Sequence, residues 1–142
     1  MPYFKDEKDL VDVQRVFFDK LASDPETGSE IRASNLILRF VSRDPAGVVT
    51  IDCRGAAGEG KYFGVIFGES SLSPDITLTT SADLGHEFWL GKANMVNALF
   101  SGKAKASGDV TLAMKFLPSL KRIAAVYKQV LATLGREDLL PK

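Results

Sequence analysis

The hydrophobic pattern of this chain changes its period twice along the sequence, and this change limits the folds that the chain can adopt. Residues 3–22 carry apolar side chains at spacings of three and four, which predicts an amphipathic helix that Asp24-Pro25 ends. Between residues 36 and 80 the period falls to two, as in strands with one buried face. From residue 81 the helical period returns. This order predicts an α+β fold with a five-stranded, mainly antiparallel sheet and helices packed on one face.

Four strands are predicted in the central region, and we expect them to follow one another as a meander. In the first of them, Leu36, Leu38 and Phe40 share one face, and a turn at residues 44–47 joins it to the second. The four segments are "SNLILRFVSRD" (34–44), "VVTIDCRG" (48–55), "YFGVIFG" (62–68) and "DITLTTS" (75–81).

Helical spacing dominates the rest of the chain. Ser81 is predicted to cap a short helix that Gly91 ends, and Gly135 is placed to end the last helix. The segment "PETGSE" (25–30) is predicted to be a loop. The predicted helices are residues 82–90, 93–100, 110–117 and 119–134, with Pro118 between the last two.

Composition narrows the class of protein. Eighteen basic residues balance eighteen acidic ones, so the chain lacks the basic excess that marks nucleic-acid-binding proteins. No apolar run is long enough to cross a bilayer, the first ten residues are charged where a signal peptide is apolar, and one cysteine excludes an internal disulfide. We therefore expect one cytoplasmic domain over residues 1–142, which binds no nucleic acid and has no integral membrane association.

One apparent phosphate-binding motif is G-x-x-x-x-G-K, formed by Gly55, Gly60 and Lys61. Such a loop needs Ser or Thr at the next position to hold magnesium, and a helix whose N-terminus faces the phosphates. Tyr62 stands there instead, and a strand-like segment follows. We interpret residues 55–62 as a hairpin loop.

Nucleophilic catalysis would depend on His86, because it is the only histidine and every Ser-His or Cys-His pair must use it. It lies on a short predicted helix beside Glu87, where we expect a solvated or capping side chain near the surface. One histidine and one cysteine are also too few for a typical transition-metal site. We therefore expect no enzyme activity, no metal and no cofactor. An acyl-transferring or hydrolytic enzyme that uses His86 is the disfavoured alternative.

The distinctive feature of the chain is apolar. Residues 84–100 hold many large apolar side chains, most of which belong to the core. Phe88, Trp89 and Leu90 are consecutive, however, and at 100° per residue along a helix they cannot all point the same way. At least one of the three is exposed, lies at an interface or faces an internal space for a ligand.

Residues 73–116 carry an ordered pattern that resembles the sterol carrier protein 2 family of lipid-binding domains. The matching motifs are Pro74-Asp75-Ile76-Thr77-Leu78, Gly91-Lys92, Phe100-Ser101-Gly102-Lys103 and Gly108-Asp109. With the upstream hairpin, the resemblance extends over residues 3–134. Two segments depart from it, the long helix after Pro118 and the segment 25–30.

The resemblance implies a five-stranded sheet with helices on one face that encloses a hydrophobic tunnel, in which this family binds fatty acids, acyl-CoA or sterols. It implies that the chain binds or transfers such a lipid without catalysis, with at most transient membrane contact. The ligand-binding residues that it implies are Phe40, Ile51, Phe67, Leu78, Leu84, Phe88, Trp89, Met95, Val96, Leu99, Phe100, Met114, Leu117 and Leu120.

A lipid site of this kind needs no catalytic residue. Burial of about ten methylenes yields up to roughly 8 kcal/mol, whereas an empty apolar cavity of about 300 Å³ costs on the order of 7 kcal/mol. We therefore expect the lipid to stabilise the protein, or the cavity to collapse when empty. The alternative function is an interaction or accessory module, in which the same apolar surface binds a partner protein or a second copy. The sequence leaves the oligomeric state open.

The segment "FSGKAKASGD" (100–109) is predicted to form the last strand beside this site. Phe100 is expected to face the lipid space, Lys103 and Lys105 to point to water, and Ala104 and Ala106 to point inward. Two roles remain open for the lysines: they protect the strand edge from unwanted pairing, or they meet an acidic headgroup at the tunnel mouth.

Overall fold

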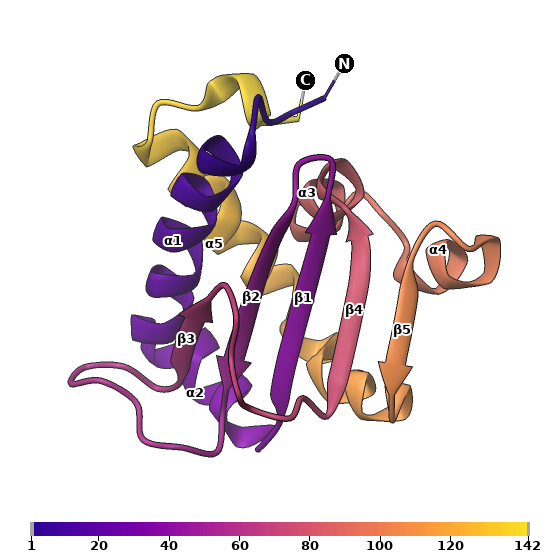
Figure 1. Ribbon diagram of the computed structural model, residues 1–142. Helices are drawn as coiled ribbons and strands as arrows, with labels where there is room; N and C mark the ends of the chain where they lie inside the picture. Colours follow the sequence, from indigo (N-terminus) through magenta and orange to yellow (C-terminus); the bar gives the residue numbers. More distant parts are fainter. Residues whose placement is uncertain (1, 142) are drawn as a thin grey trace.

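The computed structural model describes residues 2–141, which form a sheet and the helices around it (Figure 1). The strands are β1 (Ile37–Arg43), β2 (Gly47–Asp52), β3 (Gly64–Phe67), β4 (Ile76–Ser81) and β5 (Lys105–Gly108). The α-helices are α1 (Glu7–Ser23), α2 (Pro25–Ala33), α3 (Ala82–Trp89), α4 (Met95–Ser101) and α5 (Leu120–Thr133). The 3₁₀ helices are η1 (Val110–Ser119) and η2 (Glu137–Leu139).

The sheet has the strand order β3-β2-β1-β4-β5, and the predicted α+β class with a mainly antiparallel sheet is confirmed. The predicted meander is wrong in one respect, because β4 pairs in parallel with β1 and does not lie beside β3. Residues 68–75 carry the chain back across the sheet, and the Arg39 guanidinium donates a 2.8 Å hydrogen bond to the Leu72 carbonyl on the way. Periodicity shows which face of a strand is buried, but it does not identify the neighbouring strand.

Asp75 fixes the start of the parallel pair. Its carboxylate accepts a 2.8 Å hydrogen bond from the Ile37 amide, and its own amide donates to the Ile37 carbonyl at 2.8 Å. The hydrogen bond from Ile37 lowers the pKa of Asp75, and the Arg54 guanidinium, 2.7 Å from the carboxylate, lowers it further. Asp75 belongs to the Pro-Asp motif noted in the sequence, so this motif sets the register of β4 against β1.

Short polar residues begin the helices. Ser81 accepts a 3.1 Å hydrogen bond from the Leu84 amide and caps α3, as predicted. Asp24 accepts a 2.8 Å hydrogen bond from the Thr27 amide and caps α2. The predicted loop at residues 25–30 is therefore wrong. Asp24-Pro25 ends α1 and also starts a second helix, because proline is favoured in the first helical turn.

The segment after β5 is helical, as predicted for residues 110–117. It forms the 3₁₀ helix η1, which continues to Ser119 and contains Pro118. Proline has no amide hydrogen to donate, and α5 begins only after it, at Leu120. Gly135 follows α5 with a φ of +69°, a left-handed conformation that glycine adopts at little cost.

Helices α1, α2 and α5 cover one face of the sheet; in Figure 1, α1 is seen at the left beside β3 and α5 runs behind β2. Phe17 and Phe18 of α1 and Leu131 of α5 are fully buried there, in one apolar cluster with Val49 and Ile51 of β2. α3 lies over one end of the sheet, and α4 stands at the β5 edge, far from α1. Within residues 2–141, no helix has both the length and the apolar character that crossing a membrane requires.

Candidate functional site

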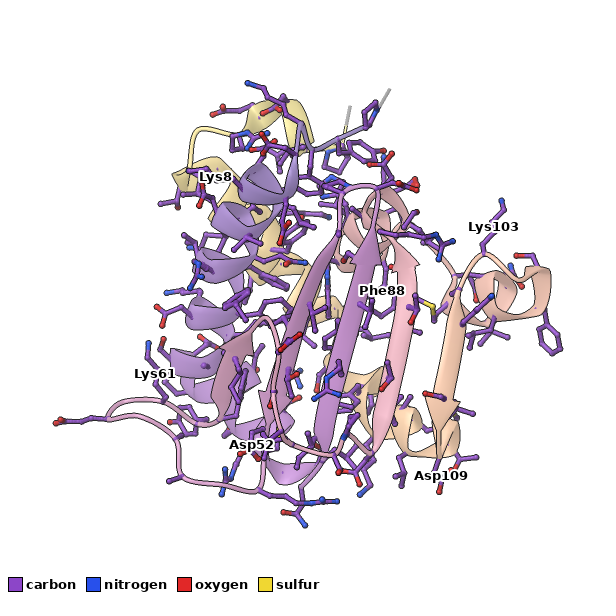
Figure 2. The ribbon with its side chains drawn as sticks, in the orientation of Figure 1. Lys8, Asp52, Lys61, Phe88, Lys103 and Asp109 are labelled. Atoms are coloured by element: carbon purple, nitrogen blue, oxygen red, sulfur yellow. The ribbon has the colours of Figure 1, made fainter. Side chains whose placement is uncertain are left out.

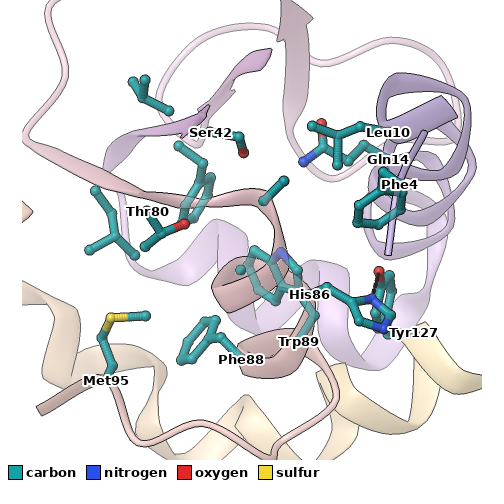
Figure 3. A pocket seen from close by; sticks show the side chains of 15 residues that line it. Phe4, Leu10, Gln14, Ser42, Thr80, His86, Phe88, Trp89, Met95 and Tyr127 are labelled. Atoms are coloured by element: carbon teal, nitrogen blue, oxygen red, sulfur yellow. Dashed lines mark hydrogen bonds between the residues drawn. The ribbon is translucent and has the colours of Figure 1, made fainter. Parts of the chain in front are cut away.

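A small pocket lies between the inner face of the sheet and helices α1, α3 and α5 (Figure 3). Its volume is about 30 Å³, enough for about one water molecule. The tunnel that the resemblance implies is thus a narrow pocket in this structure. The lining residues are Phe4, Leu10, Gln14, Phe40, Val41, Ser42, Leu78, Thr80, Ala82, Gly85, His86, Phe88, Trp89, Met95 and Tyr127.

The apolar wall of the pocket is a cluster of aromatic rings around Trp89. The Trp89 ring centre lies 5.7 Å from that of Phe18 and 5.4 Å from that of Phe40, both edge to face. Pairs of this kind contribute about 0.5–1.5 kcal/mol each beyond their buried area. The consecutive residues Phe88, Trp89 and Leu90 therefore have three different positions. Leu90 is buried, Trp89 joins the ring cluster, and Phe88 is half-buried at the pocket.

Three neutral polar side chains line one level of the pocket. Ser42 of β1 and Thr80 of β4 are direct neighbours in the parallel register. Gln14 of α1 lies beside Gly47, which pairs with Ser42 from the other side. Thr80 and Gln14 are 6% and 9% exposed, and none of the three side chains hydrogen-bonds to another residue in the range 2–141. No lysine, arginine, aspartate or glutamate lines the pocket, so it offers hydrogen bonds without charge.

His86 is 2% exposed, so the predicted surface position is wrong. Its Nε2 lies 2.8 Å from the Leu139 carbonyl, and its Nδ1 lies 2.7 Å from the Tyr127 hydroxyl. A carbonyl only accepts hydrogen bonds, so Nε2 carries the proton and Tyr127 donates to Nδ1. Burial lowers the pKa of His86 and favours this neutral form. Both ring nitrogens are occupied, which leaves neither as a base for a molecule in the pocket.

The chain ends explain why His86 is buried. The Tyr3 and Phe4 rings lie 4.4 Å and 5.6 Å from the imidazole, centre to centre, and η2 supplies the Leu139 carbonyl. These covering segments are more than fifty residues away along the chain. The local pattern around residue 86 therefore contained no sign of them.

The predicted ligand-binding residues fall into three groups: those that line the pocket, those packed outside it, and those exposed to solvent. Those that line the pocket are Phe40, Leu78, Phe88, Trp89 and Met95. Those in the core or half-buried outside the pocket lining are Ile51, Phe67, Leu84, Leu99 and Leu120. Leu117 belongs to η1, and its side chain lies outside the described part of the structure.

Val96, Phe100 and Met114 differ from the expectation, because they are 59%, 89% and 64% exposed. α4 buries its small Ala98, which is 5% exposed. Val96 and Phe100 lie two residues to either side of Ala98, about 200° around the helix, so they share the outward face. Phe100 therefore points to solvent and not to the lipid space.

Other predictions about loops agree with the structure. Residues 55–62 form a loop that leads into β3, as predicted. Lys103 and Lys105 are exposed and Ala104 is buried, also as predicted.

Cys53 is buried, and this desolvation raises the pKa of its thiol to about 11. Within residues 2–141, no group of three or more His, Cys, Asp or Glu side chains is placed to hold a metal ion.

Sequence reasoning missed the polar half of the pocket. One sign was present: Leu10, Gln14 and Phe18 follow one another at i+4 spacing, so Gln14 interrupts the apolar stripe of α1. A polar residue on a buried stripe indicates a hydrogen-bonding need in the interior. Ser42 and Thr80 carried no such sign, because polar residues are common where a strand ends.

Comparisons with known proteins bear on this fold. The SCP-2 sterol transfer family matches residues 17–121, which include β1 to β5. The sterol carrier protein domain 2 of Helicoverpa armigera is 26% identical, with a TM-score of 0.60, over 81% of this chain and 87% of that one. Sterol carrier protein 2 from Yarrowia lipolytica in its apo form is 24% identical, with a TM-score of 0.52, over 82% and 87%. A palmitated SCP2L2 from Aedes aegypti is 18% identical, with a TM-score of 0.51, over 75% and 92%. Because the match covers more than half of the chain and includes the whole sheet with α3 and α4, the chain belongs to the SCP-2 sterol transfer family.

Proposed function

We propose that this protein binds one hydrophobic lipid in the pocket between α3 and the sheet, and that it carries this lipid without altering it chemically. The observation that carries the proposal is the pocket lining. Phe40, Leu78, Phe88, Trp89 and Met95 form an apolar wall in a chain of a sterol transfer family. Apolar walls with a few convergent polar groups are typical of lipid and cofactor sites.

A lipid requires the pocket to widen from about 30 Å³. The half-buried Phe88 and Met95 lie at the two ends of the short link between α3 and α4, so a shift of α4 moves one wall of the pocket. An empty cavity of about 300 Å³ costs on the order of 7 kcal/mol. Burial of about ten methylenes of a bound lipid in this cavity contributes up to roughly 8 kcal/mol of favourable free energy. The narrow and lipid-filled arrangements are therefore close in free energy, which suits a carrier that must also release its lipid.

The polar level of the pocket indicates which headgroup it accepts. Gln14, Ser42 and Thr80 supply neutral donors and acceptors, and no charged side chain lines the pocket. A hydroxyl or carbonyl group matches them, whereas a carboxylate inside the pocket would lack a counter-charge. We expect the carboxylate of a fatty acid, or the phosphates of acyl-CoA, to remain at the pocket mouth in water.

The proposed function needs no catalytic residue. His86 touches the pocket, but its nitrogens bond to Tyr127 and Leu139. Its role is to hold α3, α5 and η2 together. This arrangement supports a binding function over acyl transfer or hydrolysis.

Native mass spectrometry of the purified protein, followed by lipid extraction, tests the proposal. The delipidated protein is then titrated with hexadecanol, cholesterol and hexadecanoate, and the last of these follows from the palmitated relative of the same fold. We expect a change in the emission of Trp89, the one tryptophan of the chain, and a raised melting temperature. Probe at 100 times its Kd stabilises the protein by about 2.7 kcal/mol. Absence of copurified lipid together with an unchanged melting temperature for all three probes would reject the proposal.

Two pocket variants and one control locate the site. Phe88→Trp fills the pocket and should weaken binding of every probe. Thr80→Val preserves shape but removes a hydroxyl, and should weaken binding of hexadecanol by roughly tenfold with little effect on hexadecanoate. Val16→Trp, on the outward side of α1 at 38% exposure, is the matched control and should bind all three probes normally, with binding to both tryptophan variants read from the melting temperature. Equal effects of the pocket and control variants would place the site elsewhere.

A further inference from the structure

α4 presents an apolar face that no other part of residues 2–141 covers. Phe100 is 89% exposed and Val96 is 59% exposed, one helical turn apart on the same side. Figure 1 shows α4 at the β5 edge, away from the layer formed by α1 and α5. A phenylalanine this exposed buries little of its apolar surface within its own chain, so that surface remains available to a binding partner.

The charged residues next to α4 in the sequence, between residues 88 and 108, are all basic. Lys92 precedes the helix by three residues, and Lys103 and Lys105 follow it within four; all three are exposed. Residues 88–108 contain no aspartate or glutamate. Figure 2 shows Lys103 beside α4, pointing away from the body of the protein. An exposed aromatic residue flanked by lysines suits a surface that is apolar inside and anionic outside.

The same helix reaches the pocket. Met95, its first residue, lines the pocket, and Val96 begins the outward face. A partner bound to the outward face of α4 therefore contacts the same helix that forms one wall of the pocket.

We infer that the outward face of α4, formed by Val96 and Phe100 with Lys92, Lys103 and Lys105, docks on an anionic lipid bilayer and that lipid enters the pocket beneath this helix. The purpose of this docking rests on the proposed lipid-binding function, but the docking itself is measured without it. Charge opposes a symmetric dimer through this face, because two such faces in contact would bring six lysines together without a counter-charge.

Co-sedimentation with phosphatidylcholine vesicles, with and without phosphatidylserine, tests the inference on the full chain. We expect binding that requires phosphatidylserine and weakens at high salt. Phe100→Ser should reduce the affinity on the order of tenfold. Lys103→Ser and Lys105→Ser should each reduce it about fivefold. The matched controls are Val16→Ser on α1 and the pair Lys121→Ser and Lys128→Ser on α5, all exposed residues away from α4, which should leave vesicle binding unchanged.

Three outcomes would overturn the inference: no vesicle binding, binding that Phe100→Ser does not weaken, or a dimer in light scattering that Phe100→Ser dissociates while vesicles are not bound. Uptake of hexadecanol from solution, followed by Trp89 emission, separates this result from the fate of the proposed function. Normal uptake without vesicle binding rejects the α4 surface alone. Vesicle binding without uptake of any probe supports the surface as a membrane contact and rejects the pocket function.

Discussion

The hydroxyl of Tyr127 donates a 2.7 Å hydrogen bond to Nδ1 of His86 in the interior of the protein. His86 lies on α3 and Tyr127 on α5, and the opposite imidazole nitrogen donates to the Leu139 carbonyl of η2. This chain of bonds joins three helical segments at the end of the sheet next to the pocket. Its polar groups are buried, so each one depends on its partner.

Tyr127→Phe should lower the free energy of unfolding by about 1–3 kcal/mol, because it leaves Nδ1 of His86 buried without a donor. Urea denaturation followed by circular dichroism measures this change. The matched control is Tyr62→Phe. The Tyr62 side chain is exposed and its hydroxyl has no hydrogen-bond partner within residues 2–141, so the loss should stay below about 0.5 kcal/mol. Equal losses in the two variants would contradict a structural role for the His86 bond.

The stability of the protein should fall as the pH drops below 6.5. Burial lowers the pKa of His86 from 6.5 and Lys92 adds to this effect, whereas the hydrogen bond to the Leu139 carbonyl and the charges of Asp83 and Asp138 oppose it. The unfolded chain therefore takes up a proton at a higher pH than the folded protein does. The contribution of neutral His86 is fully present above pH 6.5 and is lost as the pH falls toward the folded-state pKa, by at most about 1.4 kcal/mol per pH unit.

Nuclear magnetic resonance reads this titration directly, because His86 is the only histidine. The imidazole of the folded protein should titrate with a midpoint below 6.5, and urea denaturation at a series of pH values should show the matching slope. His86→Gln should remove the slope near pH 6, while carboxylates such as Asp75 titrate only at much lower pH. A midpoint above 6.5 would contradict the prediction.

Asp75→Ala should destabilise the protein far more than Arg54→Ala, although the two residues form one ion pair. Asp75 accepts the Ile37 amide and fixes the first residues of the parallel pair, a charge-assisted bond that contributes about 1.5–3 kcal/mol. The Arg54 side chain is 45% exposed, and an ion pair of this kind contributes less than about 1 kcal/mol. Thermal unfolding of both variants compares them. Similar losses would show that the ion pair, and not the backbone bond, carries the stability.

Gly108→Ala should destabilise the protein by about 3 kcal/mol or more. Gly108 has a φ of +93°, and a Cβ atom there would lie 2.0 Å from the carbonyl oxygen of Asp75, the residue just before β4. Gly60 has a similar φ of +76° but open space around it, so Gly60→Ala should cost only about 1 kcal/mol of backbone strain. Chemical denaturation of the pair isolates the steric part. Equal losses would mean that backbone strain alone explains both.

Much of the fold was predictable because local patterns carry the information. Apolar and polar residues alternate in the strand segments of residues 36–81 because each strand buries one face. Ser81, as a capping residue, predicted the start of α3. One local prediction, the loop at residues 25–30, was wrong for a local reason. Asp24-Pro25 is compatible with a helix end and with a helix start, and the structure uses it for both. The helix predicted before Pro118 is present, and its 3₁₀ form is a detail that the apolar spacing did not predict.

By itself, the sequence determined the type of each main element, the face that each strand buries and the family motifs around Asp75 and Gly108. These depend on the backbone period and on contacts within a few residues. Only the tertiary structure decided that β4 lies beside β1, that His86 is buried under both chain ends, and that Phe100 points outward. It also decided that Gln14, Ser42 and Thr80 line one pocket. Each of these depends on packing between segments far apart in the chain, and the free energy of such contacts is not encoded in any short window of sequence.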